Sequence, residues 1–247
     1  TTSAATPIPD TLVRRTDDAV DKILARQVTD PASPFCGGTP DQYGLVMAGS
    51  GGGIINTAGA AYLCPASRHH HSPRAKEAVR LAAGFLVRRQ SPDGNIDLET
   101  TNFNSPPDTG FVVWNVAEIA CAAHRLGDSE IEAILKPFLL GAAKGLTKGG
   151  VHTPNHRWVV SSALAQIHSI WPDPAYLRRI DQWLAEGIDI DDDGQYTERS
   201  TSIYNTVCDR AFTLMAAKLK RPELLEPVRK NLNAMMYLLH PGYEVVT

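Results

Sequence analysis

Apolar residues recur every three to four positions along most of the chain, and this period constrains the fold more than any other feature. Stripes of this kind occupy residues 12–24, 75–86, 111–123, 131–142, 159–167, 177–184, 203–215 and 224–239. Such spacing places apolar side chains on one face of an α-helix. Alternation with a period of two, the pattern of half-buried strands, is scarce. The chain is therefore predicted to be all-α.

Helix boundaries are indicated by capping residues, prolines and glycines. Ser72-Pro73 and Asp108 or Thr109 are expected to open helices. The glycine-rich stretch 49–53 is expected to precede a short helix formed by the small residues 54–62.

A weak internal repeat predicts how these helices are arranged. The same order of features occurs twice, in residues 89–100 and 192–200. Each segment leaves a helix, passes through an Asp-Gly turn, a short extended piece with a Glu and a polar loop, and enters the next helix. A third segment, residues 148–156, also leads from a glycine turn into a helix. Helical hairpins of this length stack on their neighbours to bury both faces. We therefore expect a single domain over residues 1–247, an incomplete (α/α) toroid of roughly four to five hairpins.

In a toroid, all connections from outer to inner helices emerge at one end. The polar loops at residues 94–108, 149–157 and 194–203 should therefore converge on one mouth. Loops held by a rigid scaffold, and spaces between packed helices, are common places for binding sites. The mouth is the predicted functional site.

The first candidate group is Asn155, His156, Arg157 and Trp158, at the start of a predicted helix. A side-chain amide and an imidazole are suited to holding and polarising a carboxylate, so Asn155 and His156 are candidate catalytic residues. Arg157 and Trp158 are assigned to substrate binding. The alternative for Asn155 is an ordinary helix N-cap.

The second group contains Glu198, Arg199 and Tyr204. Ser200 or Thr201 would cap the following helix, which places Tyr204 in its first turn as a candidate catalytic residue. Glu198 and Arg199 are assigned to substrate binding. The alternatives are a half-buried core tyrosine and a surface ion pair between Glu198 and Arg199.

A third group lies in the segment 101–109, where a proline pair stiffens a loop with two asparagines. Asn102 and Asn104 can donate and accept hydrogen bonds, as sugar hydroxyls require, and we assign them to a wall of the substrate site. The alternative is an Asx-rich turn with Asp108 as a helix cap.

The segment 193–200 followed by Tyr204 resembles the Asp-Gly…Glu-Arg/Gly-Ser…Tyr segment of the heparinase II/III-like polysaccharide lyases. Asn155-His156 is similar to the Asn(-His) segment that these enzymes carry at the start of an earlier inner helix. The resemblance covers about the second half of the chain, and its motifs are short. The family's α/α toroid agrees with the predicted layout.

The resemblance implies β-elimination at a uronic acid within an acidic polysaccharide or oligosaccharide. Asn155 would neutralise the uronate carboxylate and stabilise the enolate-like intermediate. Tyr204 would give a proton to the leaving glycosidic oxygen and could also act as the base. His156 would assist as base or carboxylate ligand, and Arg199 would stabilise the phenolate of Tyr204 or bind another acid group. The scheme requires no metal and no cofactor.

Lyases of this type usually carry a further histidine in a β-sandwich domain after the toroid. The sequence shows no β-rich segment before it ends at residue 247. We therefore expect either a longer parent protein with a covalent C-terminal β-domain or a subfamily that does without this domain.

The overall charge excludes some partners and leaves the compartment open. The formal net charge is −3, with no basic run or zinc-finger spacing, so no nucleic-acid partner is expected. No apolar stretch approaches the length of a membrane span. Residues 1–9 lack a charged and then apolar signal pattern. A periplasmic or secreted location is favoured over a cytoplasmic one.

Two other patterns in the sequence resemble known kinds of site. The run 189–194 imitates the start of a calcium loop, but Ser200 stands where an EF-hand needs an acid, so only a looser calcium site stays open. A disulfide between Cys36 and Cys64 stays open too.

Other functions compete with the lyase. A toroidal glycoside hydrolase would use paired carboxylates, for which Asp108, Glu99 and Glu198 are available. A terpene-cyclase-like toroid would be rich in aromatic residues, which make up 7% of this chain. A non-catalytic helical carbohydrate-binding module would not need the Asn, His and Tyr candidates to occur together at the starts of the helices.

Overall fold

The computed structural model describes residues 8–244. Two stretches lie outside this range. They are residues 1–7, which belong to the segment without a signal pattern, and residues 245–247 at the end of the predicted domain. The elements are α1 (Asp10–Arg26), α2 (Ala48–Leu63), α3 (Pro73–Arg89), β1 (Ile96–Leu98), β2 (Asn102–Ser105), α4 (Pro106–Leu126), α5 (Ser129–Lys148), α6 (Pro154–His168), α7 (Pro174–Ala185), α8 (Tyr204–Leu219), the 3-10 helix η1 (Pro222–Leu225) and α9 (Glu226–Met236).

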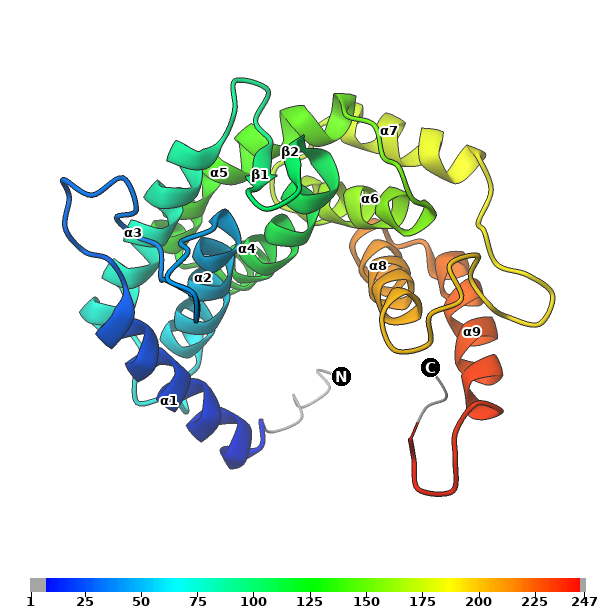
Figure 1. The fold of residues 1–247 in the computed structure, drawn as a ribbon, viewed down its shortest axis with the longest axis horizontal. Coiled ribbons are helices and arrows are strands. Elements are labelled where there is room, and N and C mark those ends of the chain that lie inside the picture. Colours follow the sequence, from blue (N-terminus) through cyan, green and yellow to red (C-terminus); the bar gives the residue numbers. More distant parts are fainter. Residues whose placement is uncertain (1–7, 245–247) are drawn as a thin grey trace.

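The helices form an arc of hairpins with an inner and an outer layer (Figure 1). Helices α2, α4, α6 and α8 pack against one another in that order along the inside. Helices α3, α5, α7 and α9 follow on the outside, and α1 packs against α2 and α3. Figure 1 shows the arc open between α1 and α9. The predicted all-α, incomplete toroid is confirmed, with four hairpins and one preceding helix in the described part of the chain.

The burial of each helix explains which sequence patterns were visible. Outer helix α7 buries only one stripe, Tyr176, Ile180 and Trp183. Inner helix α6 lies between α4, α7 and α8 and is buried on every side from Trp158 to Ile167. A helix surrounded by neighbours has no polar face. The core is one continuous cluster that runs through both layers.

The predicted repeat is present in three dimensions. Gly94 and Gly194 both adopt positive φ, at 92° and 88°, and both follow an aspartate in a tight turn. In the first turn the backbone N–H of Ser91 donates to the Asn95 carbonyl over 2.8 Å; in the second, that of Asp191 donates to the Gln195 carbonyl over 2.9 Å. Each turn lies against an outer helix, α5 or α9. The turns fix where the mouth loops begin.

Some predicted boundaries were wrong. The glycine-rich stretch does not precede α2 but forms its first turns. Gly51 and Gly52 pack closely against Leu86 and Val112, and a Cβ at either position would lie 3.0 Å from a neighbouring side chain. This packing offsets the low helix propensity of glycine. Helix α4 begins before Asp108, with Ser105 as its N-cap.

The four cysteines, Cys36, Cys64, Cys121 and Cys208, are free thiols, so the disulfide between Cys36 and Cys64 is absent. Within residues 8–244, no helix has the length and apolar character needed to cross a bilayer.

Candidate functional site

The connections that lead into α2, α4, α6 and α8 meet on one face of the arc, at the N-terminal ends of these helices, as the loop argument predicted. The backbone N–H of Ala48, at the start of α2, donates to Oε1 of Glu99 over 3.0 Å. At the starts of α4 and α6, the rings of Phe111 and His156 lie 6.0 Å apart, edge to face. The loop before α8 reaches the start of α6 through Glu198. We call this face of the arc, where the inner helices begin, the mouth.

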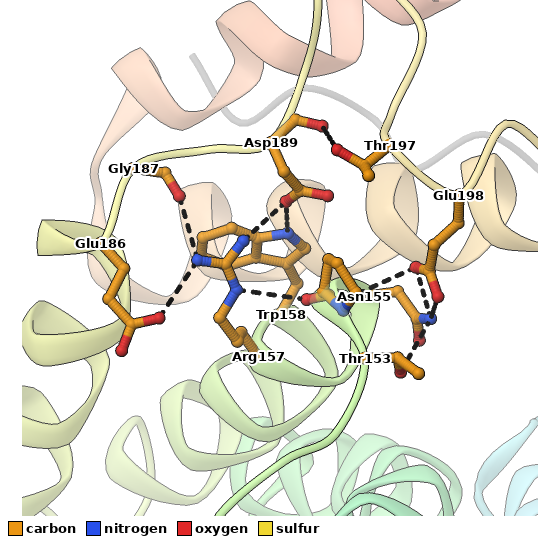
Figure 2. A network of polar contacts seen from close by, with 10 residues as sticks. Thr153, Asn155, Arg157, Trp158, Glu186, Gly187, Asp189, Thr197 and Glu198 are labelled. Atoms are coloured by element: carbon orange, nitrogen blue, oxygen red, sulfur yellow. Dashed lines mark hydrogen bonds and ion pairs between the residues drawn. The ribbon is translucent and has the colours of Figure 1, made fainter.

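Asn155 holds a carboxylate at the first turn of α6 (Figure 2). Its Nδ2 lies 2.8 Å and 2.6 Å from Oε1 and Oε2 of Glu198, and its backbone N–H donates to Oε2 over 3.0 Å. Nδ2 is also 3.4 Å from Oγ1 of Thr153. Asn155 is 1% exposed, and its buried Oδ1 has no hydrogen-bond partner in the protein. The N-cap of α6 is Thr153, so Asn155 is not the cap.

Asp189 ties the long loop before α8 to the start of α6 (Figure 2). Its Oδ1 accepts from Nη2 of Arg157 over 2.9 Å and from Nε1 of Trp158 over 3.0 Å. Its backbone carbonyl accepts from the N–H of Thr197 over 3.0 Å. Nη1 of Arg157 pairs with Glu186 at 3.3 Å. Within residues 8–244, no group of three or more His, Cys, Asp and Glu side chains is arranged to hold a metal ion.

These contacts bear on two predicted substrate-binding residues. Trp158 is fully buried and packs against Phe212, with ring centroids 4.8 Å apart. It has no surface to offer a sugar, so its predicted substrate contact is not supported. Arg157 lies over the Trp158 ring at 4.6 Å and has a side chain 12% exposed. Both residues hold the mouth together.

His156 is half-buried at the start of α6. Its ring meets that of His152 edge to face, with centroids 4.9 Å apart. Burial, with a smaller contribution from His152, holds the pKa of His156 below its usual 6.5, while Asp108 opposes the shift. Its Nδ1 is buried without a hydrogen-bond partner in the protein. A neutral imidazole with an unused nitrogen is able to accept a proton at neutral pH.

Tyr204 is the first residue of α8, as predicted, and is 39% exposed. The expected cap by Ser200 or Thr201 is wrong, because Ile203 is the N-cap and makes no side-chain cap. Since α6 and α8 are packed neighbours, Tyr204 and Asn155 open adjacent inner helices at the mouth. The phenol is accessible, and the amide is covered.

Asn205 is a residue at the mouth that the sequence argument missed. It is 0% exposed, and neither Oδ1 nor Nδ2 has a hydrogen-bond partner in the protein. Buried polar atoms without partners are uncommon and are often functional. An asparagine directly after Tyr204, on the stripe of an inner helix, was the available signal.

Glu198 and Arg199 do not pair with each other. Nη2 of Arg199 lies 3.2 Å from Oδ2 of Asp191, and the Arg199 side chain is 73% exposed. Arg199 has a positive φ of 45°, which turns the chain sharply after Glu198. Its predicted part in substrate binding stays a prediction.

The two loop asparagines lie in different surroundings. Nδ2 of Asn102 donates to Oδ2 of Asp108 over 3.1 Å. Asn104 has a positive φ of 48° and joins an Asx-rich turn, with Nδ2 3.1 Å from Oδ2 of Asp93 and Oδ1 2.7 Å from Oγ of Ser91. The turn accounts for the Asn104 side chain alone, and the predicted substrate contacts of both asparagines stay predictions.

A cavity of about 380 Å³ opens at the mouth between the starts of α2 and α4. Its lining includes Asp41, Met47, Glu99, Asp108 and Phe111. Phe111 also contacts His156, so the cavity and the first turn of α6 adjoin. A second cavity of about 430 Å³ is lined by polar groups that include Lys144 and Lys148 near the loop before α6. The two cavities share no lining residue.

No protein-family model matches this chain, and no curated protein matches it. Among solved structures, it is similar to a sugar epimerase from a ruminal bacterium, with a TM-score of 0.58, 11% identity, and coverage of 94% of this chain and 73% of that one. It also overlaps a polysaccharide lyase with a TM-score of 0.43, 12% identity, and coverage of 97% of this chain and 47% of that one.

At these identities the similarity to the epimerase shows a shared helical fold and no more. The overlap with the lyase has a TM-score below 0.5 and carries no argument about this chain. Both neighbours are carbohydrate-active enzymes by name. The heparinase II/III-like resemblance therefore rests on the sequence motifs alone.

Proposed function

We propose that this chain is a carbohydrate-active enzyme, a polysaccharide lyase that cleaves a uronic-acid-containing polymer by β-elimination. The observation that carries the proposal is the carboxylate held by Asn155. The backbone N–H and the side-chain amide of Asn155 both donate to one carboxylate at the mouth, next to His156. A uronate needs the same donors. The proposed location is periplasmic or secreted.

In the proposed reaction, the C5–H and C4–O bonds of the uronate break and a C4=C5 double bond forms. Asn155 binds the uronate carboxylate and stabilises the charge that develops when the C5 proton leaves. His156, neutral because of its burial, accepts that proton. Tyr204 gives its phenolic proton to the departing glycosidic oxygen. Lys144 and Lys148, which outnumber the one carboxylate, Asp93, in the lining of their cavity, supply local positive charge for an anionic polymer.

The hydrolase alternative is less well supported, because most of its candidate carboxylates are already engaged. Glu99 accepts from the Ala48 N–H and lies 3.3 Å from Arg89. Asp108 accepts from Asn102, so only Glu198 is left, and a glycosidase of this kind needs a pair of carboxylates. A general acid or base in such a mechanism needs a carboxylate free to exchange a proton with substrate.

A second candidate function is epimerisation of a sugar. The observation that favours it is the adjacent pair His152 and His156, since epimerisation at an acidic C–H needs one group to remove a proton and another to return one. Solvent deuterium separates the two functions. An epimerase incorporates deuterium into an intact saccharide, whereas a lyase releases an unsaturated product.

The proposed function is tested by incubating the chain with a panel of uronic-acid polymers and following ultraviolet absorbance, which rises when a conjugated unsaturated uronate forms. We expect Tyr204→Phe and Asn155→Ala to reduce the rate at least about 100-fold, the usual scale for loss of an acid–base or electrostatic group. Tyr243→Phe is the matched control, because Tyr243 is an exposed tyrosine that follows α9.

Reducing ends without ultraviolet absorbance would identify a hydrolase, and binding without turnover would identify a carbohydrate-binding module. Full activity in both Tyr204→Phe and Asn155→Ala, with unchanged melting temperatures, would show that the site assignment is wrong.

A further inference from the structure

The amide of Asn155 is closed to any ligand in this structure. Asn155 is 1% exposed, and the two oxygens of Glu198 lie 2.8 Å and 2.6 Å from its Nδ2. The same Nδ2 also lies 3.4 Å from Oγ1 of Thr153. Every donor of the Asn155 side chain is therefore directed to an acceptor within the protein.

We infer that Glu198 occupies the place of the substrate carboxylate and is exchanged for it when a uronate binds. The inference rests on the proposed function, in which Asn155 is the carboxylate ligand. The carboxylate of Glu198 takes the two donors, one from the backbone and one from the side chain, that the substrate needs. Two ionised carboxylates at one amide repel each other, so the two acids bind there in turn.

The surroundings of Glu198 allow this exchange without refolding the loop. Tyr196, two residues earlier, is fully buried and its hydroxyl donates to Asp209 over 3.0 Å. Arg199, one residue later, turns away toward Asp191. Glu198 itself is only partly buried. A rotation of its side chain uncovers Asn155 while Tyr196 stays in place.

The exchange makes Glu198 a specificity-determining residue. A neutral sugar has no group that can replace the carboxylate at Asn155, so the amide stays covered. A uronate offers an equivalent carboxylate and restores the contacts that Glu198 gives up. The site then selects an acidic sugar by requiring the replacement of an acid that is already bound.

Glu198 also has a plain structural role that the test has to separate. The N-cap Thr153 makes no side-chain cap, so Glu198 caps α6 from the neighbouring loop. A residue that only caps the helix affects stability when it is replaced and leaves uronate affinity unchanged. Asp173 provides the matched control, since its side chain caps outer helix α7 by accepting from the Ala175 N–H over 2.8 Å.

The experiment is a calorimetric titration of the full chain with D-glucuronate, and with D-glucose as the neutral probe. Wild type, Glu198→Gln, Glu198→Ala and Asp173→Ala are compared, with melting temperatures recorded for each. We expect Glu198→Ala to bind glucuronate about tenfold more tightly than wild type, because the competing charged acceptor is gone. Glu198→Gln is intermediate, Asp173→Ala is unchanged, and no variant gains affinity for glucose.

Unchanged or weaker glucuronate binding in folded Glu198→Ala overturns the inference. If that variant does not fold, the same criterion applies to Glu198→Gln, which keeps an acceptor for the cap. Binding is measured without turnover, so the two proposals fail separately. Tighter binding with no polymer cleavage refutes the lyase and supports the exchange, whereas cleavage with a raised KM in Glu198→Ala refutes the exchange alone.

Discussion

At the scale of single residues, Asp209 is an acid whose surroundings disfavour its charge. It lies on α8, and burial raises its pKa to about 6, although the hydrogen bond from the Tyr196 hydroxyl opposes the shift. The folded chain therefore binds this proton more tightly than the unfolded chain does. The contribution of Asp209 to the free energy of unfolding therefore falls as the pH rises from about 4 to about 6.

We expect Asp209→Asn to raise the free energy of unfolding at about pH 7 by at most about 3 kcal/mol, because the amide carries no charge and its oxygen still accepts from Tyr196. At about pH 4 the variant and wild type should be similar. Urea unfolding at both pH values measures the effect, with the exposed Asp193→Asn as control. A variant that is less stable than wild type at about pH 7 would contradict this account.

His156 gives a second prediction at this scale. If it accepts the C5 proton, the acid limb of the kcat/KM profile reports its pKa, which burial and His152 hold below 6.5. His152→Ala should move the acid limb toward higher pH. The move should undo only part of the lowering of the His156 pKa, because burial is the larger cause of that lowering. His124→Ala, at an exposed position, should leave it in place. A midpoint above 6.5 in wild type would exclude His156 as that base.

At the scale of elements, the repeated turns depend on glycine for two separate reasons. Gly94 has a positive φ, and a Cβ at this position would overlap the carbonyl oxygen of Gly141 in α5. Gly44 has a positive φ of 82° but open space around it. The two positions separate backbone strain from close packing.

We expect Gly94→Ala to lower the free energy of unfolding by more than about 3 kcal/mol, since the clash with α5 adds to the strain. Gly44→Ala should lose only about 1 kcal/mol, the strain alone. Chemical denaturation of both variants gives the comparison. Equal losses at the two positions would mean that the turn at Gly94 can move away from α5.

The helices were predictable from the sequence because their apolar stripes are local. The start of α2 was not, because its glycines have a low intrinsic preference for helix and are retained by packing against α3 and α4. The contact between Asn155 and Glu198 was missed for another reason. The residues are 43 positions apart and meet only because the loop before α8 returns to the start of α6. Local reasoning offered Arg199 as the partner instead.

At the scale of the whole molecule, the arc gives its helices unequal numbers of neighbours. Helices α4 and α6 are covered on both sides by inner helices, whereas α1 and α9 lie at the open ends (Figure 1). In stacked hairpins, stability comes largely from contacts between neighbours. The ends of the arc should therefore open locally more readily than its middle.

Hydrogen exchange followed by mass spectrometry tests this expectation. Amides of α4 and α6 should be the slowest to exchange, and protection should fall toward α1 and α9. Replacing Ser129, an exposed residue at the start of α5, with Ala serves as a control that should not change the order. Slowest exchange in α1 or α9 would show that stability does not follow the stacking.

The mouth and the opposite face of the arc differ in a way that matters for handling the protein. The long loops gather at the mouth, while the connection from α4 to α5 on the opposite face is only Gly127 and Asp128. The native thiols are buried or partly buried, so a cysteine introduced at the exposed Arg125 would be the preferred site for a maleimide. A chain immobilised through that position would present its mouth to solution, which suits surface-based measurement of saccharide binding.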